Sequence, residues 1–187
     1  MASNTEHYQL PLPQFDTPVR LLIVVAPYYR AIADDQIAGA RAIAQRAGAT
    51  VDLVEVPGAL EIPTAIGMAA RNGAYDGFVA LGCVIRGETT HYDTVCNDSS
   101  RGLTLLGLQG YSIGNGILTV ENYEQAAVRA NPGDQDKGGG AAAAALHLIA
   151  LARKWPAGGA RRGGASALPA DHDPIRLAGA LDGGDRA

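Results

Sequence analysis

The stretch Gly77-Phe-Val-Ala-Leu-Gly-Cys-Val-Ile-Arg-Gly-Glu-Thr-Thr-His91 changes character in its middle. Residues 77–85 are apolar or small, which is typical of a strand buried on both faces of a sheet. Residues 86–91 are polar, titratable or glycine, and they stand where such a strand would pass into a helix. The stretch therefore predicts a buried strand with a polar turn at its carboxyl end.

Similar apolar runs recur along the chain, and each is followed by a segment of helical character. Further strands are predicted at 20–26, 50–56 and 115–120. Helices are predicted over about 34–47, 63–73, 92–109, 121–130 and 141–155, with Asp34 and Asp35 as caps of the first and 131–140 as a Gly-rich loop. Alternating buried strands and helices predict an α/β protein, a flavodoxin-like three-layer α/β/α sandwich with a four-stranded parallel sheet.

The 187 residues suit one domain with an extension at each end. Residues 1–18 carry three prolines and no periodicity, and they predict an extended N-terminal arm. Residues 19–155 form the predicted domain. Residues 156–187 are rich in Gly, Ala and Pro without aromatic residues, so we expect a disordered tail that cannot bury enough apolar area to fold.

Composition excludes several classes of function. Hydrophobic residues make up 47% and charged residues 18%, and the net charge of −4 argues against a nucleic-acid partner. Two cysteines, Cys83 and Cys96, do not make a disulfide framework and suggest free thiols in a reducing compartment. Neither a signal peptide nor a membrane-spanning run is recognisable, so a cytoplasmic protein without a membrane partner is expected.

Polar clusters follow every predicted strand. They are Tyr28–Tyr29, Pro57–Glu61, Arg86–His91 and Glu121–Asn122. Because the carboxyl ends of parallel strands share one edge of a sheet, we expect these four clusters to meet in one ligand site.

The turn at 86–91 has two possible interpretations. It precedes a predicted helix, whose free N–H groups and dipole favour an anion, and Gly87, Thr89 and Thr90 suit a phosphate cradle. It does not contain the Walker pattern, and an ordinary Ser/Thr helix cap is equally compatible with the spacing. His91 is the candidate acid–base group, since imidazoles generally titrate near neutrality.

Other candidates each have a plainer alternative. Arg129 and Lys137 could bind phosphate or could be solvated surface charges. Glu61 could orient a polyol or simply favour a helix N-terminus, and Tyr28 with Tyr29 could stack on a planar ring or pack within a loop. His91, Asp93 and Cys96 lack a second pair at metal-ligand spacing, so no metal site is predicted.

Four segments together resemble the 6,7-dimethyl-8-ribityllumazine synthase (lumazine synthase) family. They are VPGALEIP (56–63), YDGFVALGCVIRGETTHYDTVCNDSSRG (75–102), GNGILTVENYEQAAVRA (114–130) and DKGGGAAAAAL (136–146). The resemblance covers about residues 18–155. It implies a cofactor-free enzyme of riboflavin biosynthesis that condenses 5-amino-6-(D-ribitylamino)uracil with 3,4-dihydroxy-2-butanone 4-phosphate, releasing phosphate and water. A non-catalytic flavin or lumazine binder and an assembly scaffold are the alternatives.

The resemblance also implies roles for particular residues. His91 matches the proton-shuttling histidine. The phosphate would be held by Gly87, Glu88, Thr89, Arg129 and Lys137. The ribityl chain would be oriented by Ala59, Leu60 and Glu61. The pyrimidine would be bound by Tyr28, Cys83, Val84, Ile85 and Asn115.

Three positions depart from the family pattern. Tyr29 stands where asparagine is usual, Leu60 where phenylalanine is common, and Asn115 where many members carry an aromatic residue. We expect these changes to affect ring stacking more than phosphate binding. The family further implies self-association as pentamers or multiples of pentamers, sites between neighbouring subunits, and riboflavin synthase as a candidate partner.

Overall fold

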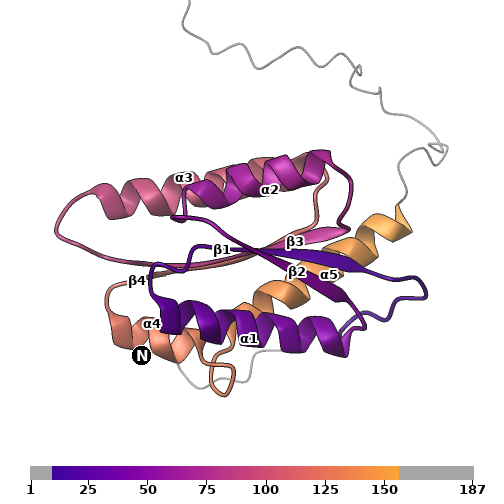
Figure 1. The fold of residues 1–187 in the computed structure, drawn as a ribbon, viewed down its shortest axis with the longest axis horizontal. Coiled ribbons are helices and arrows are strands. Elements are labelled where there is room, and N and C mark those ends of the chain that lie inside the picture. Colours follow the sequence, from indigo (N-terminus) through magenta and orange to yellow (C-terminus); the bar gives the residue numbers. More distant parts are fainter. Residues whose placement is uncertain (1–9, 156–187) are drawn as a thin grey trace, which may run out of the picture. The chain divides into compact units, whose positions relative to one another are not determined.

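The computed structural model describes residues 10–155. The first nine residues of the predicted arm and the whole predicted tail lie outside the described residues. Four strands and five helices follow one another in this part of the chain (Figure 1): β1 (Arg20–Val25), α1 (Arg30–Arg46), β2 (Thr50–Glu55), α2 (Glu61–Arg71), β3 (Gly77–Ile85), α3 (His91–Leu108), β4 (Ile113–Val120), α4 (Tyr123–Ala130) and α5 (Lys137–Lys154).

The strands form one parallel sheet in the order β2-β1-β3-β4. Helices α2 and α3 cover one face of this sheet, and α1, α4 and α5 cover the other (Figure 1). The prediction of a flavodoxin-like three-layer sandwich with a four-stranded parallel sheet is confirmed. No helix within residues 10–155 is long and apolar enough to cross a lipid bilayer.

Alternate side chains of the central strands enter two separate apolar cores. Leu21, Ile23 and Val25 of β1 pack in the core under α1 and α5. Leu22 and Val24 pack in the core under α2 and α3. Burial on both faces explains why β1 after Arg20, and β3, consist of apolar or small residues rather than alternating apolar and polar ones.

The predicted start of the first helix was wrong. Helix α1 begins at Arg30, so Asp34 and Asp35 lie inside it and do not cap it. The extended backbone of Tyr29 starts the helix, and its carbonyl accepts a hydrogen bond of 3.0 Å from Ala33 N–H. Asp34 instead lies 3.9 Å from the Arg30 guanidinium, one helical turn earlier.

The glycines at 138–140 were also misassigned, because they belong to α5 and not to a loop. Asp136 adopts left-handed backbone angles (φ 41°), and its Oδ1 accepts a hydrogen bond of 2.9 Å from Gly139 N–H. A Cβ at Gly138 would overlap the backbone of Gln36 in α1. Glycine therefore permits close helix packing here. The starts of β4, α2, α3 and α4 differ from prediction by only one or two residues.

We predict that Gly114→Ala lowers the free energy of unfolding by about 1–3 kcal/mol, because a Cβ on this β4 residue would overlap the Ala141 carbonyl of α5. Urea unfolding followed by circular dichroism measures the change. Gly107→Ala is the matched control: its Cβ would meet no atom within 4 Å among the described residues, and α-helical alanine should stabilise by about 0.5–1 kcal/mol. Equal stability of Gly114→Ala and the wild type would contradict the close approach of α5 to β4.

Candidate active site

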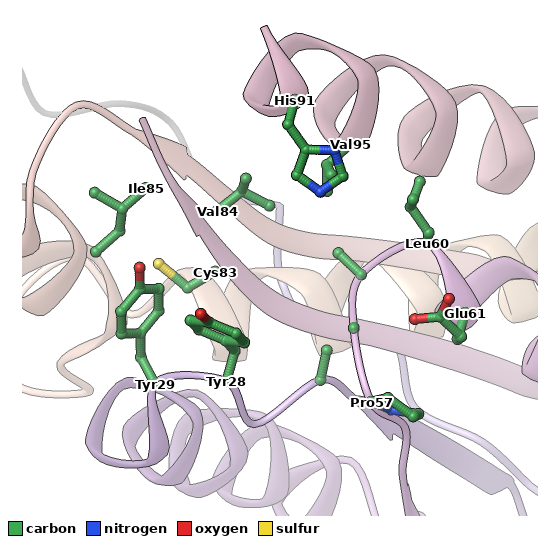
Figure 2. Close-up of a pocket in the computed structure, with 13 residues that line it drawn as sticks. Tyr28, Tyr29, Pro57, Leu60, Glu61, Cys83, Val84, Ile85, His91 and Val95 are labelled. Atoms are coloured by element: carbon green, nitrogen blue, oxygen red, sulfur yellow. The ribbon is translucent and has the colours of Figure 1, made fainter. Parts of the chain in front are cut away.

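A hollow of about 440 Å³ lies at the carboxyl edge of the sheet, between the ends of β1 and β3 (Figure 2). In the order β2-β1-β3-β4, the chain leaves β1 towards one side and β3 towards the other, which makes this the point where ligands bind in open α/β sheets. Predicted site residues that line it are Tyr28, Ala59, Leu60, Glu61, Cys83, Val84, Ile85 and His91. The other lining residues are Ala26, Tyr29, Pro57, Gly58 and Val95.

The end of β3 forms one side of the hollow. The two strands pair as far as Val25 and Leu81, and Ala26 N–H donates the last hydrogen bond, 2.9 Å, to the Leu81 carbonyl. Strand β3 then continues to Ile85 with β4 alone as its paired strand in the described part of the chain. Backbone N–H and C=O groups on its β1 side are therefore available to a planar ligand beyond Leu81.

Cys83 lies at this strand end, and burial raises the pKa of its thiol to about 11. The thiol therefore stays protonated at neutral pH and acts as a small apolar surface, not as a nucleophile.

Two tyrosines of the β1–α1 loop line the hollow beside Cys83 (Figure 2). The Tyr28 side chain is 77% exposed, so its ring is open to a stacking partner. Tyr29 packs edge-to-face on Tyr28, with ring centroids 5.0 Å apart, and on Tyr123 of α4 at 6.3 Å. Burial first, and then Tyr28 and Cys83, raise the pKa of Tyr29. Tyr29 thus supports Tyr28 through aromatic packing, a role that an asparagine could not perform.

The segment after β2 lines another part of the hollow. It turns tightly, because Glu61 N–H donates to the Gly58 carbonyl at 3.2 Å, and a Cβ on Gly58 would lie 2.9 Å from Glu61 Oε2. Glu61 is in the first turn of α2, where the helix dipole favours its charge, and it also lines the hollow. Both interpretations of Glu61 are therefore compatible with its position.

His91 is the first residue of α3, and its ring points towards the hollow beside Val95, one turn further along (Figure 2). Its backbone N–H makes a long contact of 3.4 Å with Thr89 Oγ1. Thr90 occupies the cap position without a side-chain hydrogen bond to the described part of the chain. The start of α3 therefore lacks the full threonine cap that was the alternative to an anion site.

The candidates for phosphate binding, and the pyrimidine candidate Asn115, lie outside this hollow. Gly87, Glu88 and Thr89 belong to the exposed turn before α3, and none of them is among the residues that line the hollow. Asn115, Arg129 and Lys137 line a second hollow of about 330 Å³, between the edge strand β4 and helices α4 and α5.

Two of these side chains already make hydrogen bonds to the backbone. Arg129 donates to the Gln125 carbonyl at 3.0 Å, and Asn115 Oδ1 accepts from Ile117 N–H at 3.0 Å. The Asn115 oxygen is thus engaged by its own strand.

The expectation that all four strand ends meet in one pocket was wrong for β4. Glu121, which follows β4, does not line the first hollow; its carboxylate accepts a hydrogen bond of 2.9 Å from Arg86 Nε. The cause is geometric, since β4 is separated from β1 by β3.

No group of three His, Cys, Asp or Glu side chains within residues 10–155 is placed to hold a metal ion. His91, Asp93 and Cys96 therefore do not form a ligand set there. Cys83 and Cys96 are both free thiols.

Known proteins match most of the chain. Residues 18–153 match the family described as 6,7-dimethyl-8-ribityllumazine synthase. A protein of that name from Jannaschia sp. (strain CCS1) is 57% identical over 157 residues, covering 84% of this chain and 88% of the relative. Proteins of that name from Novosphingobium aromaticivorans and Agrobacterium fabrum are 53% and 56% identical, covering 73% and 72% of this chain and 98% and 95% of those relatives.

This chain belongs to the lumazine synthase family. The match covers every strand and every residue that lines the first hollow, so both hollows lie in the part of the chain that the family shares. From the sequence, Tyr29 was a candidate for ring stacking or for packing within its loop, and a departure from the lumazine synthase pattern. Its packing on Tyr123 joins residues 94 positions apart, and no local signal in the sequence indicates it.

We predict that Cys83 reacts slowly with iodoacetamide. In a Cys96→Ser variant at pH 8, the folded protein should be alkylated at least about a hundred-fold more slowly than the urea-unfolded chain, because a pKa raised from 9.0 to about 11 leaves that much less thiolate. The rate should rise as the pH approaches 11. Cys83→Ser, which leaves the more accessible Cys96, is the control, and comparable rates for folded and unfolded Cys83 would disprove the assignment.

Proposed function

We propose that this chain condenses 5-amino-6-(D-ribitylamino)uracil with 3,4-dihydroxy-2-butanone 4-phosphate to form 6,7-dimethyl-8-ribityllumazine, the product in the name of its relatives. The single observation that carries the proposal is the hollow at the β1–β3 divergence. It brings together an imidazole, a tyrosine ring and a strip of strand backbone in a protein of the lumazine synthase family. That family assignment supports riboflavin biosynthesis.

Each wall of the hollow suits a different part of the pyrimidine substrate. The ring would stack on Tyr28 while its polar edge hydrogen-bonds the backbone at Cys83–Ile85. The ribityl chain would extend towards Ala59–Glu61, where a carboxylate can accept hydroxyl hydrogen bonds. Holding both substrates against these walls would convert a bimolecular reaction into an effectively unimolecular one, which is a large share of the catalysis.

The reaction requires several proton transfers. The substrate amine adds to the ketone and water leaves, giving an imine; phosphate is then eliminated, and the second amine closes the ring with loss of another water. His91 points into the hollow and is the side chain positioned to move protons during these steps.

Phosphate binding is best explained by more than one copy of the chain. Turn 87–89 stands at the N-terminus of α3, where an anion is favoured, but Arg129 and Lys137 line the other hollow. We propose that copies assemble as pentamers or multiples of pentamers, in which Arg129, Lys137 and Asn115 of one copy complete the site of its neighbour. A heterologous ring of this kind uses two different surfaces of every subunit, and the separation of the two hollows supports such an arrangement.

A non-catalytic flavin or lumazine binder was the alternative from the sequence. It is not favoured, because the relatives that match most of the chain are named as synthases. We further propose a cytoplasmic location, supported by the two free cysteines, and riboflavin synthase as the partner that receives the product.

We predict that His91→Gln lowers kcat by about a hundred-fold or more, the usual contribution of a positioned acid–base group. Lumazine fluorescence, corrected for the uncatalysed reaction, measures the rate. His147→Gln is the matched control, since His147 lies in α5 and lines neither hollow in the described part of the chain. A folded wild-type sample that makes no lumazine above background would reject the proposed function.

We predict that two inactive variants complement each other. His91→Gln spoils the first hollow and Arg129→Ala the second, so each alone should lack activity in saturating pyrimidine and limiting phosphate substrate. Subunits mixed randomly in equal amounts should recover about a quarter of wild-type activity, because one interface in four then pairs two intact hollows. Absence of recovery in assembled mixed oligomers would show that Arg129 does not act on a neighbour's site.

A further inference from the structure

Arg86 joins three parts of the fold beside the proposed phosphate turn. It directly follows β3, and its backbone N–H extends the ladder to β4 by donating to the Val120 carbonyl at 2.9 Å. Its Nε lies 2.9 and 3.2 Å from the two carboxylate oxygens of Glu121, at the end of β4. Its Nη1 lies 3.4 Å from Asp93 Oδ1, and its Cζ lies 4.0 Å from the ring centroid of Tyr92.

These contacts occupy the guanidinium of Arg86 with partners from the same chain. The hydrogen bond to Glu121 is the main cause that raises the pKa of Arg86, so its charge is constant over the working pH range. Two carboxylates already share that charge, and the ring of Tyr92 covers one face of the group. Arg86 is therefore unsuited to gripping a phosphate itself, although it borders the turn proposed to bind one.

The turn is held at both ends by this one side chain. Residues 87–90 leave the sheet at Arg86 and enter α3 at His91, and the next two residues of that helix, Tyr92 and Asp93, contact the same guanidinium. The first turn of α3 is thereby tied to the ends of β3 and β4. Any movement of this tie would shift both the backbone N–H groups of 87–89 and the imidazole of His91.

We infer that Arg86 is a positioning residue for the proposed reaction. It holds the phosphate turn and His91 in register with the hollow by tying α3 to Glu121, and it neutralises Glu121 and Asp93, whose charges would otherwise repel the incoming phosphate. This inference rests on the proposed function, and it predicts lower turnover together with weaker binding of the phosphate-bearing substrate, while binding of the pyrimidine is unchanged.

Isolated ion pairs at a protein surface usually contribute little, and the side chain of Arg86 is 41% exposed. Three features distinguish this one: two acidic partners from different elements, both carboxylate oxygens of Glu121 within reach, and a stacked ring. The proposed role is geometric and local, and it does not require a large contribution to global stability.

Arg20 provides a matched control. Its Nη2 lies 3.1 Å from Asp52 Oδ2, and its Cζ lies 5.2 Å from the Tyr75 ring centroid, so it combines the same kinds of partner. It stands at the first residue of β1, at the edge of the sheet opposite the hollow. Removing either arginine takes away an exposed guanidinium, a carboxylate partner and a ring contact.

The test is steady-state kinetics with each substrate varied in turn. Arg86→Gln should lower kcat/KM for the phosphate substrate by about ten- to a hundred-fold, as expected when a reacting group is misplaced by about 1 Å, and leave KM for the pyrimidine within about two-fold. Arg20→Gln should leave both parameters within about two-fold. Arg86→Lys keeps the charge but cannot reproduce the contacts with both Glu121 oxygens and the stacking on Tyr92. Compared with Arg86→Gln, it should therefore recover KM for the phosphate substrate more fully than it recovers kcat.

A double-mutant cycle identifies the partner. Glu121→Gln alone should mildly lower kcat, and Arg86→Gln/Glu121→Gln should bind the phosphate substrate better than Arg86→Gln alone, because the unpaired carboxylate is gone. Kinetic parameters of Arg86→Gln that match those of Arg20→Gln, or equal rises in KM for both substrates, would overturn the inference. If Arg86→Gln does not fold, Arg86→Lys and Glu121→Gln decide in the same way.

A separate measurement distinguishes this inference from the proposed function. Inorganic phosphate binding by calorimetry should be weaker in Arg86→Gln than in the wild type and unchanged in Arg20→Gln. A wild type that binds phosphate more tightly than Arg86→Gln but makes no lumazine would reject the proposed reaction and leave the role of Arg86 in phosphate binding supported. If the wild type is active and Arg86→Gln has the same phosphate affinity and turnover, only the inference about Arg86 is rejected.

Discussion

The early end of the β1–β3 pairing is the constraint on which the site depends. After Ala26 donates to Leu81, the β1 chain turns away into Tyr28 and Tyr29, while β3 continues to Ile85 beside β4. A strand that outruns its neighbour leaves one row of backbone polar groups without a strand to pair with. The tyrosines, the Pro57–Glu61 segment and the start of α3 all gather around that free strip.

Two ion pairs join neighbouring elements next to segments that line this hollow. Arg30 and Glu55 join the start of α1 to the end of β2, with Nη1 and Oε1 2.6 Å apart, and Arg86 and Glu121 join β3 to β4. Glycines let α5 approach β4 and α1 closely, and Lys137 at the start of α5 lines the second hollow together with Arg129. The molecule thus presents an acid–base hollow and a cationic hollow on different surfaces, which a ring of identical copies could combine.

Much of the site could be predicted because parallel strands place their carboxyl ends at one edge. Tyr28, Glu61 and His91 lie in three separate segments, and the strand pattern was sufficient to predict that they meet; Cys83 was added by the family resemblance. The failures have a common origin. The start of α1 depends on the extended backbone of Tyr29, and helical Gly138 depends on contact with Gln36, which is about a hundred residues away.

Sequence by itself determined the family, the order and type of the elements and the chemical groups available at the sheet edge, since these follow from local periodicity and motifs. Only the tertiary structure decided which groups meet. Arg86 is hydrogen-bonded to Glu121, 35 residues away, and Arg129 and Lys137 line a different hollow from His91. The physical reason is that periodicity reports which face of an element is buried, whereas the partner across a packed interface is set by the register of strands and helices that are distant in the chain.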